Sequence, residues 1–70
     1  PAAPTTNDLP DRRDQHSLSQ ADLAEDVGVT RQTINAIERG RYDPSLELAF
    51  ALAERFDCRI EDIFHPEESA

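Results

Sequence analysis

The stretch between Ser19 and Gly40 limits the possible folds most, because it places two helix start signals and two stop signals in close succession. Ser19 has a carboxylate three residues later, a pair that satisfies free backbone N–H groups at a helix start. Gly28 is a stop signal, because glycine adopts a left-handed backbone without a Cβ clash. Thr30 and Gly40 repeat the two signals. The two predicted helices cover residues 20–27 and 31–39.

The apolar residues of this stretch predict that the two helices cross steeply around a tight turn. Ala24 supplies the small side chain that a close crossing needs, and Gly28 supplies the positive φ of the turn. Ile34 and Ile37 share one face of the second helix, so we expect them to anchor it against the first. The opposite face of the second helix is then free.

That free face carries polar side chains suited to the edges of DNA bases. An arginine side chain can donate two hydrogen bonds to guanine, and asparagine or glutamine can pair with adenine in the same two-bond manner. Polar residues at the start of a second helix are typical of a recognition helix that enters the major groove. Taken alone, the same side chains could form an ordinary solvated face. The residues concerned are Arg31, Gln32, Asn35 and Arg39.

The remaining segments predict one all-α domain of five short helices with no strand. The other three helices are each bounded by a cap, a proline or a polar loop. The segments are a flexible leader (1–8), a first helix (Leu9 to His16), a fourth helix (Leu46 to about Phe56), a last helix (Arg59 to Phe64) and a short acidic tail (65–70). The DNA-binding domain is therefore expected over residues 9–64.

The net charge of −8 is unusual for a protein that binds nucleic acid, because 15 acids face only 7 bases and every base is arginine. The acids lie mainly in residues 1–29 and 45–70, whereas residues 30–44 carry three arginines and two acids. The segment expected to meet DNA is thus the least acidic one. Dense carboxylates also suit a protein that works in high salt, where long-range repulsion is screened.

Several classes of function are disfavoured by composition. Cys58 is the single cysteine, and His16 and His65 are far apart in the sequence, so we expect no metal site and no cofactor. A chain of 70 residues is too short to enclose a substrate pocket, and we expect neither an enzyme nor a small-molecule substrate. The absence of a membrane span, a signal peptide and a cysteine pair predicts a cytoplasmic protein with no membrane partner.

The sequence resembles the XRE or lambda-repressor-like transcriptional regulators in their short single-domain form. The resemblance rests on LSQADLAEDVGVTRQTINAIERGRYDPSLELAFALAERF followed by IEDIF, and it covers Leu9 to Phe64. The acid-rich surface without lysine is similar to that of the haloarchaeal members. Arg12 stands where the family usually has an apolar residue, and Pro10 shortens the first helix.

The resemblance implies roles for individual residues. Arg31 and Gln32 would read bases, Thr33 would lie near the backbone or a thymine methyl, and Asn35 would contact a base or a phosphate. The residues that would contact phosphates are Gln20, Arg39, Arg41 and Tyr42. Arg13 and Glu38 match a family pair that forms an internal salt bridge, which ties the first helix to the third.

We expect two copies to act together on a near-palindromic double-stranded DNA site. Ile60, Ile63 and Phe64 form an apolar cluster near the end of a small domain, and we expect them to form a homodimer interface. Salt cations are expected between the protein carboxylates and the DNA phosphates. The alternative is a protein-interaction module, such as an antitoxin or an acidic co-regulator, which the net charge of −8 favours.

Overall fold

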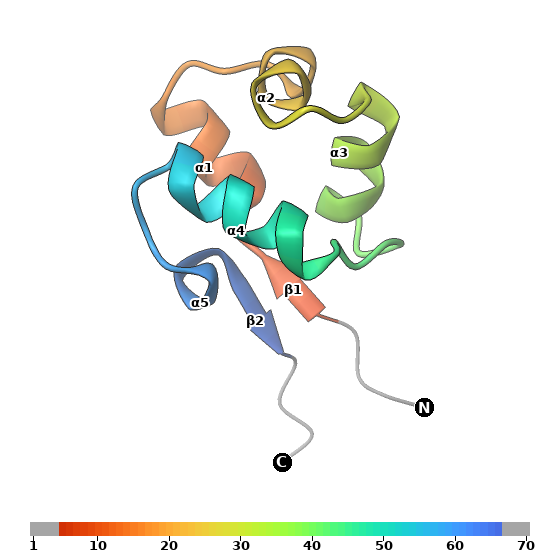
Figure 1. Cartoon of the computed structure of the whole chain (residues 1–70), viewed down its shortest axis with the longest axis vertical. Coiled ribbons are helices and arrows are strands. Elements are labelled where there is room, and N and C mark those ends of the chain that lie inside the picture. Colours follow the sequence, from red (N-terminus) through yellow and green to blue (C-terminus); the bar gives the residue numbers. More distant parts are fainter. Residues whose placement is uncertain (1–4, 67–70) are drawn as a thin grey trace.

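The computed structural model describes residues 5–66, which form five helices and a small two-stranded sheet (Figure 1). The elements in chain order are β1 (Thr5–Asn7), α1 (Leu9–Gln15), α2 (Gln20–Val27), α3 (Arg31–Glu38), α4 (Leu46–Arg55), α5 (Ile60–Ile63) and β2 (Phe64–Pro66). Each helix expected from the sequence is present, and its ends differ from the predicted ones by at most one residue. The prediction of a five-helix lambda-repressor-like domain is confirmed.

The helices begin and end where short polar side chains and glycine replace missing backbone partners. At the start of α2, the Ser19 hydroxyl accepts a hydrogen bond from the Asp22 N–H, and the Asp22 carboxylate accepts one from the Ser19 N–H. Thr30 and Ser45 cap α3 and α4 through their hydroxyl groups. Gly28 ends α2 with φ of 80°, in the left-handed region.

One apolar core joins all five helices. It is assembled from the inward face of each helix, and α2 packs against both α3 and α4 while α4 packs against α5. The side chains that are fully buried are Leu9, Leu23, Ile34, Ile37, Leu52 and Ile63. Within residues 5–66, no helix combines the length and the apolar character that crossing a bilayer requires.

The expectation that the chain has no strand is wrong, because β1 and β2 pair as an antiparallel ribbon near the two ends of the chain (Figure 1). Asn7 lies opposite Phe64, and the Asp8 N–H donates to the Ile63 carbonyl over 2.9 Å. Residues 5–8, predicted to belong to a flexible leader, are therefore part of the fold, and so are residues 65 and 66 of the predicted tail. The rest of the leader and tail, residues 1–4 and 67–70, lies outside the described residues. The sequence did not predict these strands, because each has only three residues and its partner lies at the other end of the chain, so no local periodicity marks it.

Asn7 connects this ribbon to the helices on either side. Its side-chain Nδ2 donates to the Ile37 carbonyl near the end of α3 over 2.9 Å. Its Oδ1 accepts a hydrogen bond from the Leu9 N–H at the start of α1 over 3.2 Å. A single amide thus binds one backbone group at each of two helix ends. The Leu9 N–H has no partner within its own helix, whereas the Ile37 carbonyl also accepts a hydrogen bond from the Gly40 N–H.

The first helix accommodates the two residues that depart from the family pattern. Pro10 lies in the first turn of α1, where a backbone N–H is not needed. Arg12 is half-buried, and its Nη2 donates to the Asp62 carbonyl on α5 over 3.4 Å. At this position, where the family usually has an apolar side chain, the Arg12 guanidinium therefore links α1 to α5 through a hydrogen bond.

We predict that Asn7→Ala lowers the free energy of unfolding by about 1–3 kcal/mol, because it leaves the Ile37 carbonyl and the Leu9 N–H without this partner. Asn7→Asp keeps the Oδ1 that accepts from the Leu9 N–H but loses the Nδ2 that donates to the Ile37 carbonyl, so its stability should lie between those of Asn7→Ala and the wild type. The matched control is Thr6→Ala, which removes one exposed hydrogen bond and should cost less than Asn7→Ala. Urea unfolding followed by circular dichroism measures all three. Equal stability of Asn7→Ala and the wild type would contradict the role of Asn7.

Candidate nucleic-acid interface

The turn between α2 and α3 fixes which face of α3 points outward. The Val29 N–H donates back to the Ala24 carbonyl over 2.9 Å, which closes the turn around Gly28. Ile34 and Ile37 are buried at 0% and 1% exposure, so they hold the inner face of α3 against the core. The opposite face of α3 consequently projects from the domain, to the right in Figure 1.

The residues predicted to contact DNA divide into two groups by exposure. The exposed ones are Arg31, Gln32, Arg39, Arg41 and Tyr42. The half-buried ones are Gln20, Thr33 and Asn35. Gln20 begins α2 and Arg31 and Gln32 begin α3, so these three residues lie at the edge of the domain where the two helices start. Arg41 and Tyr42 lie in the loop after α3. The Thr33 hydroxyl faces the helix cap, 3.0 Å from the Thr30 hydroxyl.

A chain of hydrogen bonds runs from the core to this edge. Gln20 Nε2 donates to Glu38 Oε1 over 3.0 Å, and Gln20 Oε1 accepts a bond from Arg31 Nη1 over 3.4 Å. The Glu38 carboxylate can only accept, so it fixes the amide of Gln20 with its oxygen toward Arg31. Sequence reasoning missed this role of Glu38, because the two residues are 18 positions apart and nothing local marks the bond.

The ion pair expected between Arg13 and Glu38 is the inner end of that chain. Arg13 Nε and Nη2 donate to the two carboxylate oxygens over 2.6 and 3.1 Å, in a two-pronged geometry. The side chains are only 15% and 7% exposed. The hydrogen bond to Glu38 raises the pKa of Arg13 above its usual value. Arg13 Nη1 also donates to the Leu18 carbonyl, so the guanidinium joins α1, the following loop and α3.

A shallow hollow of about 270 Å³ separates the turn after α2 from the start of α4. Gly28 and Thr33 line one side of it, and Tyr42, Ser45 and Glu47 line the other. The presence of Glu47 here was not predicted, because helix periodicity does not say which loop an exposed residue will face. A carboxylate at this rim disfavours close approach of an anion to the start of α4.

One residue of the predicted dimer interface is misplaced. Ile63 is 0% exposed and belongs to the core of its own chain, so its side chain cannot meet a second copy. Ile60 and Phe64 are half-buried and pack on the same core. The periodicity of α5 shows one apolar face but does not reveal that α4 covers it. The large hydrophobic side chains that are exposed lie elsewhere, at Tyr42, Leu46 and Phe50.

Cys58 is half-buried beside the end of α4, and burial raises the pKa of its thiol. A raised pKa keeps the thiol protonated and lowers its reactivity. Among the residues that the structure describes, no cluster of three His, Cys, Asp or Glu side chains could hold a metal ion.

Two helices that meet at a left-handed glycine, with a buried inner face and a polar outer face on the second, define a helix-turn-helix domain. The family model described as helix-turn-helix matches residues 11–63. The chain therefore belongs to the helix-turn-helix family and is of the XRE, lambda-repressor-like type.

Relatives and solved structures of other proteins agree with this family. The chain is 59% identical over 58 residues to an uncharacterised HTH-type transcriptional regulator of Methanocaldococcus jannaschii, covering 83% of this chain and 88% of the relative. It is 47% identical over 62 residues to the uncharacterised HTH-type transcriptional regulator YgzD of Bacillus subtilis, covering 89% and 94%. It is similar to the restriction-modification controller protein C.AhdI of Aeromonas hydrophila, with a TM-score of 0.70, 31% identity and coverage of 77% and 78%.

We predict that Glu38→Ala lowers the free energy of unfolding by about 3–5 kcal/mol, because it leaves the mostly buried Arg13 guanidinium without a counter-charge. The matched control is Arg55→Ala, which breaks the Arg55–Asp26 pair. That pair is nearly as short, at 2.8 Å against 2.6 Å for the inner pair, but its side chains are 34% and 38% exposed. Its loss should cost no more than about 1 kcal/mol. Chemical denaturation measures both, and equal losses for the two variants would contradict the structural role of the inner pair.

Proposed function

We propose that this protein is a transcriptional regulator that binds specific DNA sequences by inserting α3 into the major groove. The observation that carries the proposal is the exposed position of Arg31 and Gln32 in the first turn of α3, on a face that nothing in residues 5–66 covers. The first residues of a recognition helix are those that reach base edges in this class of domain. The relatives' names as HTH-type transcriptional regulators support the same conclusion.

Each residue of the face then has a chemical task. Arg31 pairs with a guanine through its guanidinium, which Gln20 already orients by a hydrogen bond. Gln32 pairs with an adenine, and Asn35 contacts a base or a phosphate one turn further along α3. Because the Gln20 amide keeps a second N–H free, the same residue can also donate to a phosphate.

The backbone of the DNA is held from the edges of α3. Arg39 follows directly after the helix, and Arg41 and Tyr42 lie in the exposed loop beyond it, where they donate to phosphates. Thr33 contacts the backbone or a thymine methyl beside its cap. Phosphate contacts of this kind set the register of the helix and carry no sequence information themselves. Two copies acting together read a near-palindromic site.

We predict that replacing Arg31 and Gln32 together by alanine abolishes the preference for the selected DNA sequence, because the base contacts are lost. Each good two-bond base contact contributes about 1–3 kcal/mol of discrimination. The protein should remain folded, since both side chains are exposed. Arg55→Ala removes a positive charge away from α3 and is the matched control, expected to keep the sequence preference.

The measurement is fluorescence anisotropy with a duplex selected from a random pool in high salt, compared with a scrambled duplex. A double variant that still discriminates between the two duplexes would refute α3 as the reading element. A wild type that selects no sequence at all, but binds a partner protein, would favour an interaction module instead.

We predict a weak or reversed salt dependence of DNA binding. Proteins that neutralise phosphates release counterions, so their affinity falls steeply as salt rises. This chain has a net charge of −8, and cations that enter between its carboxylates and the phosphates would be taken up on binding. Titration of the labelled duplex at increasing KCl, up to molar concentrations, measures the slope. A steep fall in affinity over that range would contradict the idea.

A further inference from the structure

The hollow between the turn after α2 and the start of α4 lies next to the surface that is proposed to meet DNA. Thr33 and Tyr42 line this hollow, and the proposed function places both side chains at the DNA backbone. The hollow is open beside Gly28, because a Cβ at this residue would meet no described atom within 4 Å. A backbone phosphate that Tyr42 contacts would therefore lie at the mouth of the hollow.

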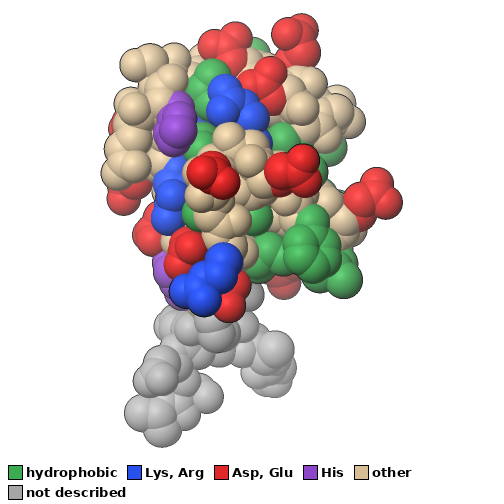
Figure 2. All heavy atoms as spheres, turned by 60° about the vertical axis from the view of Figure 1, so that its left-hand side comes forward, with side chains coloured by type: hydrophobic (Ala, Val, Ile, Leu, Met, Phe, Trp, Pro, Cys, Tyr) green, Lys and Arg blue, Asp and Glu red, His purple; other side chains and the backbone are tan. Residues whose placement is uncertain are grey.

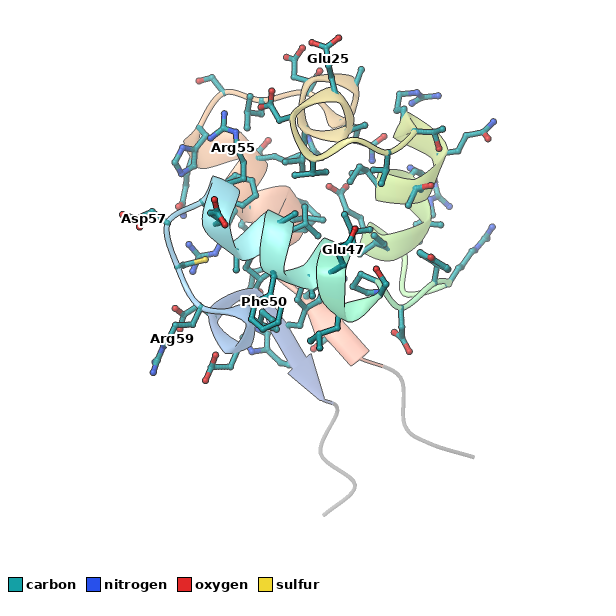
Figure 3. The ribbon with its side chains drawn as sticks, in the orientation of Figure 1. Glu25, Glu47, Phe50, Arg55, Asp57 and Arg59 are labelled. Atoms are coloured by element: carbon teal, nitrogen blue, oxygen red, sulfur yellow. The ribbon has the colours of Figure 1, made fainter. Side chains whose placement is uncertain are left out.

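Glu47 is the only charged residue among those that line the hollow. Its side chain is exposed, and no arginine or histidine within residues 5–66 forms an ion pair with it. Figure 3 shows Glu47 on the half of α4 that lies nearer to α3, whereas Arg55 lies at the far end of the helix. The negative charge of Glu47 is therefore present, without a counter-charge, where the DNA backbone would pass.

The fold gives Glu47 a favourable environment before any DNA arrives. It lies in the first turn of α4, directly after the Ser45 cap, and a carboxylate at a helix start interacts favourably with the helix dipole. Removing its charge should therefore lower the stability of the domain slightly, or leave it unchanged. The same change removes a repulsion from DNA. The effects on stability and on DNA affinity thus have opposite signs, and an experiment can separate them.

We propose that Glu47 limits how tightly the protein holds the DNA backbone at low salt and makes that hold tolerant of high salt. At low salt the carboxylate repels the phosphate beside Tyr42, and added salt screens this repulsion. The gain from screening opposes the loss from counterion release at the arginines, so the total affinity falls less as salt rises. The inference rests on the proposed function, and it assigns the expected salt dependence to one side chain.

Most other carboxylates lie farther from α3 and contribute less to this effect. Figure 2 views the side of the domain that is on the left in Figure 1, where carboxylates are scattered over the surface, whereas α3 is on the right in Figure 1. Exposed charges interact little beyond the screening length, which is about 10 Å at 0.1 M salt. Glu54 follows Glu47 by two helical turns, or about 10 Å along α4, and lines a different hollow.

The experiment measures the affinity of Glu47→Gln for labelled duplexes by fluorescence anisotropy, between about 0.05 and about 1 M KCl. At the lowest salt we expect the variant to bind about three- to fivefold more tightly than the wild type, because two unit charges about 4 Å apart in water repel by that much. The difference should vanish near 1 M KCl, where the screening length is about 3 Å. The affinity of the variant should thus fall more steeply with salt.

Two other variants change the net charge equally and serve as matched controls. Glu54→Gln removes an exposed carboxylate from the same helix and should change the affinity by less than about twofold, because it lies farther from the phosphate. Asp43→Asn lies beside Tyr42 in the loop but does not line the hollow, so its gain should be smaller than that of Glu47→Gln.

Two further readouts separate phosphate repulsion from base reading and from a better fold. Phosphate contacts carry no sequence information, so Glu47→Gln should raise the affinity for the selected duplex and for a scrambled duplex by the same factor. Thermal unfolding should show that Glu47→Gln is no more stable than the wild type. Tighter binding would then come from the lost repulsion.

Equal affinities of Glu47→Gln and Glu54→Gln at low salt would overturn the inference, and so would a gain that persists unchanged near 1 M KCl. These outcomes are separate from the fate of the proposed function. A wild type that prefers the selected duplex, with no gain in Glu47→Gln, would defeat only the role of Glu47. A gain on both duplexes by proteins that prefer neither one would defeat only the reading of specific sequences.

Discussion

The Glu38 carboxylate at the end of α3 receives hydrogen bonds from two side chains, Arg13 on α1 and Gln20 at the start of α2. A negative charge at the end of a helix is opposed by the helix dipole, and burial adds a desolvation cost. Arg13 offsets both, because its guanidinium matches the two oxygens of the carboxylate. The same contact holds three helices together and turns the Gln20 amide toward Arg31. The stability of the domain and the orientation of the Gln20 amide toward Arg31 therefore depend on the same ion pair.

The small ribbon at the chain ends reinforces the same helix from another side. Asn7 donates to the Ile37 carbonyl, so α3 is held near its end by β1 as well as by the ion pair. A domain of this size buries only a limited apolar core, so directional contacts at helix ends matter more than they would in a larger one. The outer face of α3 is left free because all of these contacts lie on its inner side.

The net charge of −8 is compatible with the proposed DNA binding because the charges are unevenly distributed along the chain. The arginines proposed to meet DNA occupy α3 and the loop after it, while most carboxylates lie on the other segments of the sequence. The exposed Leu46 and Phe50 lie on α4, whereas the exposed Arg31 and Gln32 lie on α3. The exposed apolar side chains and the face proposed to bind DNA are therefore on different helices.

The five helices, their caps at Ser19, Thr30 and Ser45, and the turn at Gly28 could be predicted from the sequence, because they depend on residues only a few positions apart. The pair of Arg13 and Glu38 came from the family resemblance. The ribbon of β1 and β2, the bond from Gln20 to Glu38 and the burial of Ile63 were decided by the tertiary structure. Each depends on segments that are distant in the chain but adjacent in space. Periodicity shows that a helix has an apolar face, but only packing determines whether a neighbouring helix or the solvent covers it.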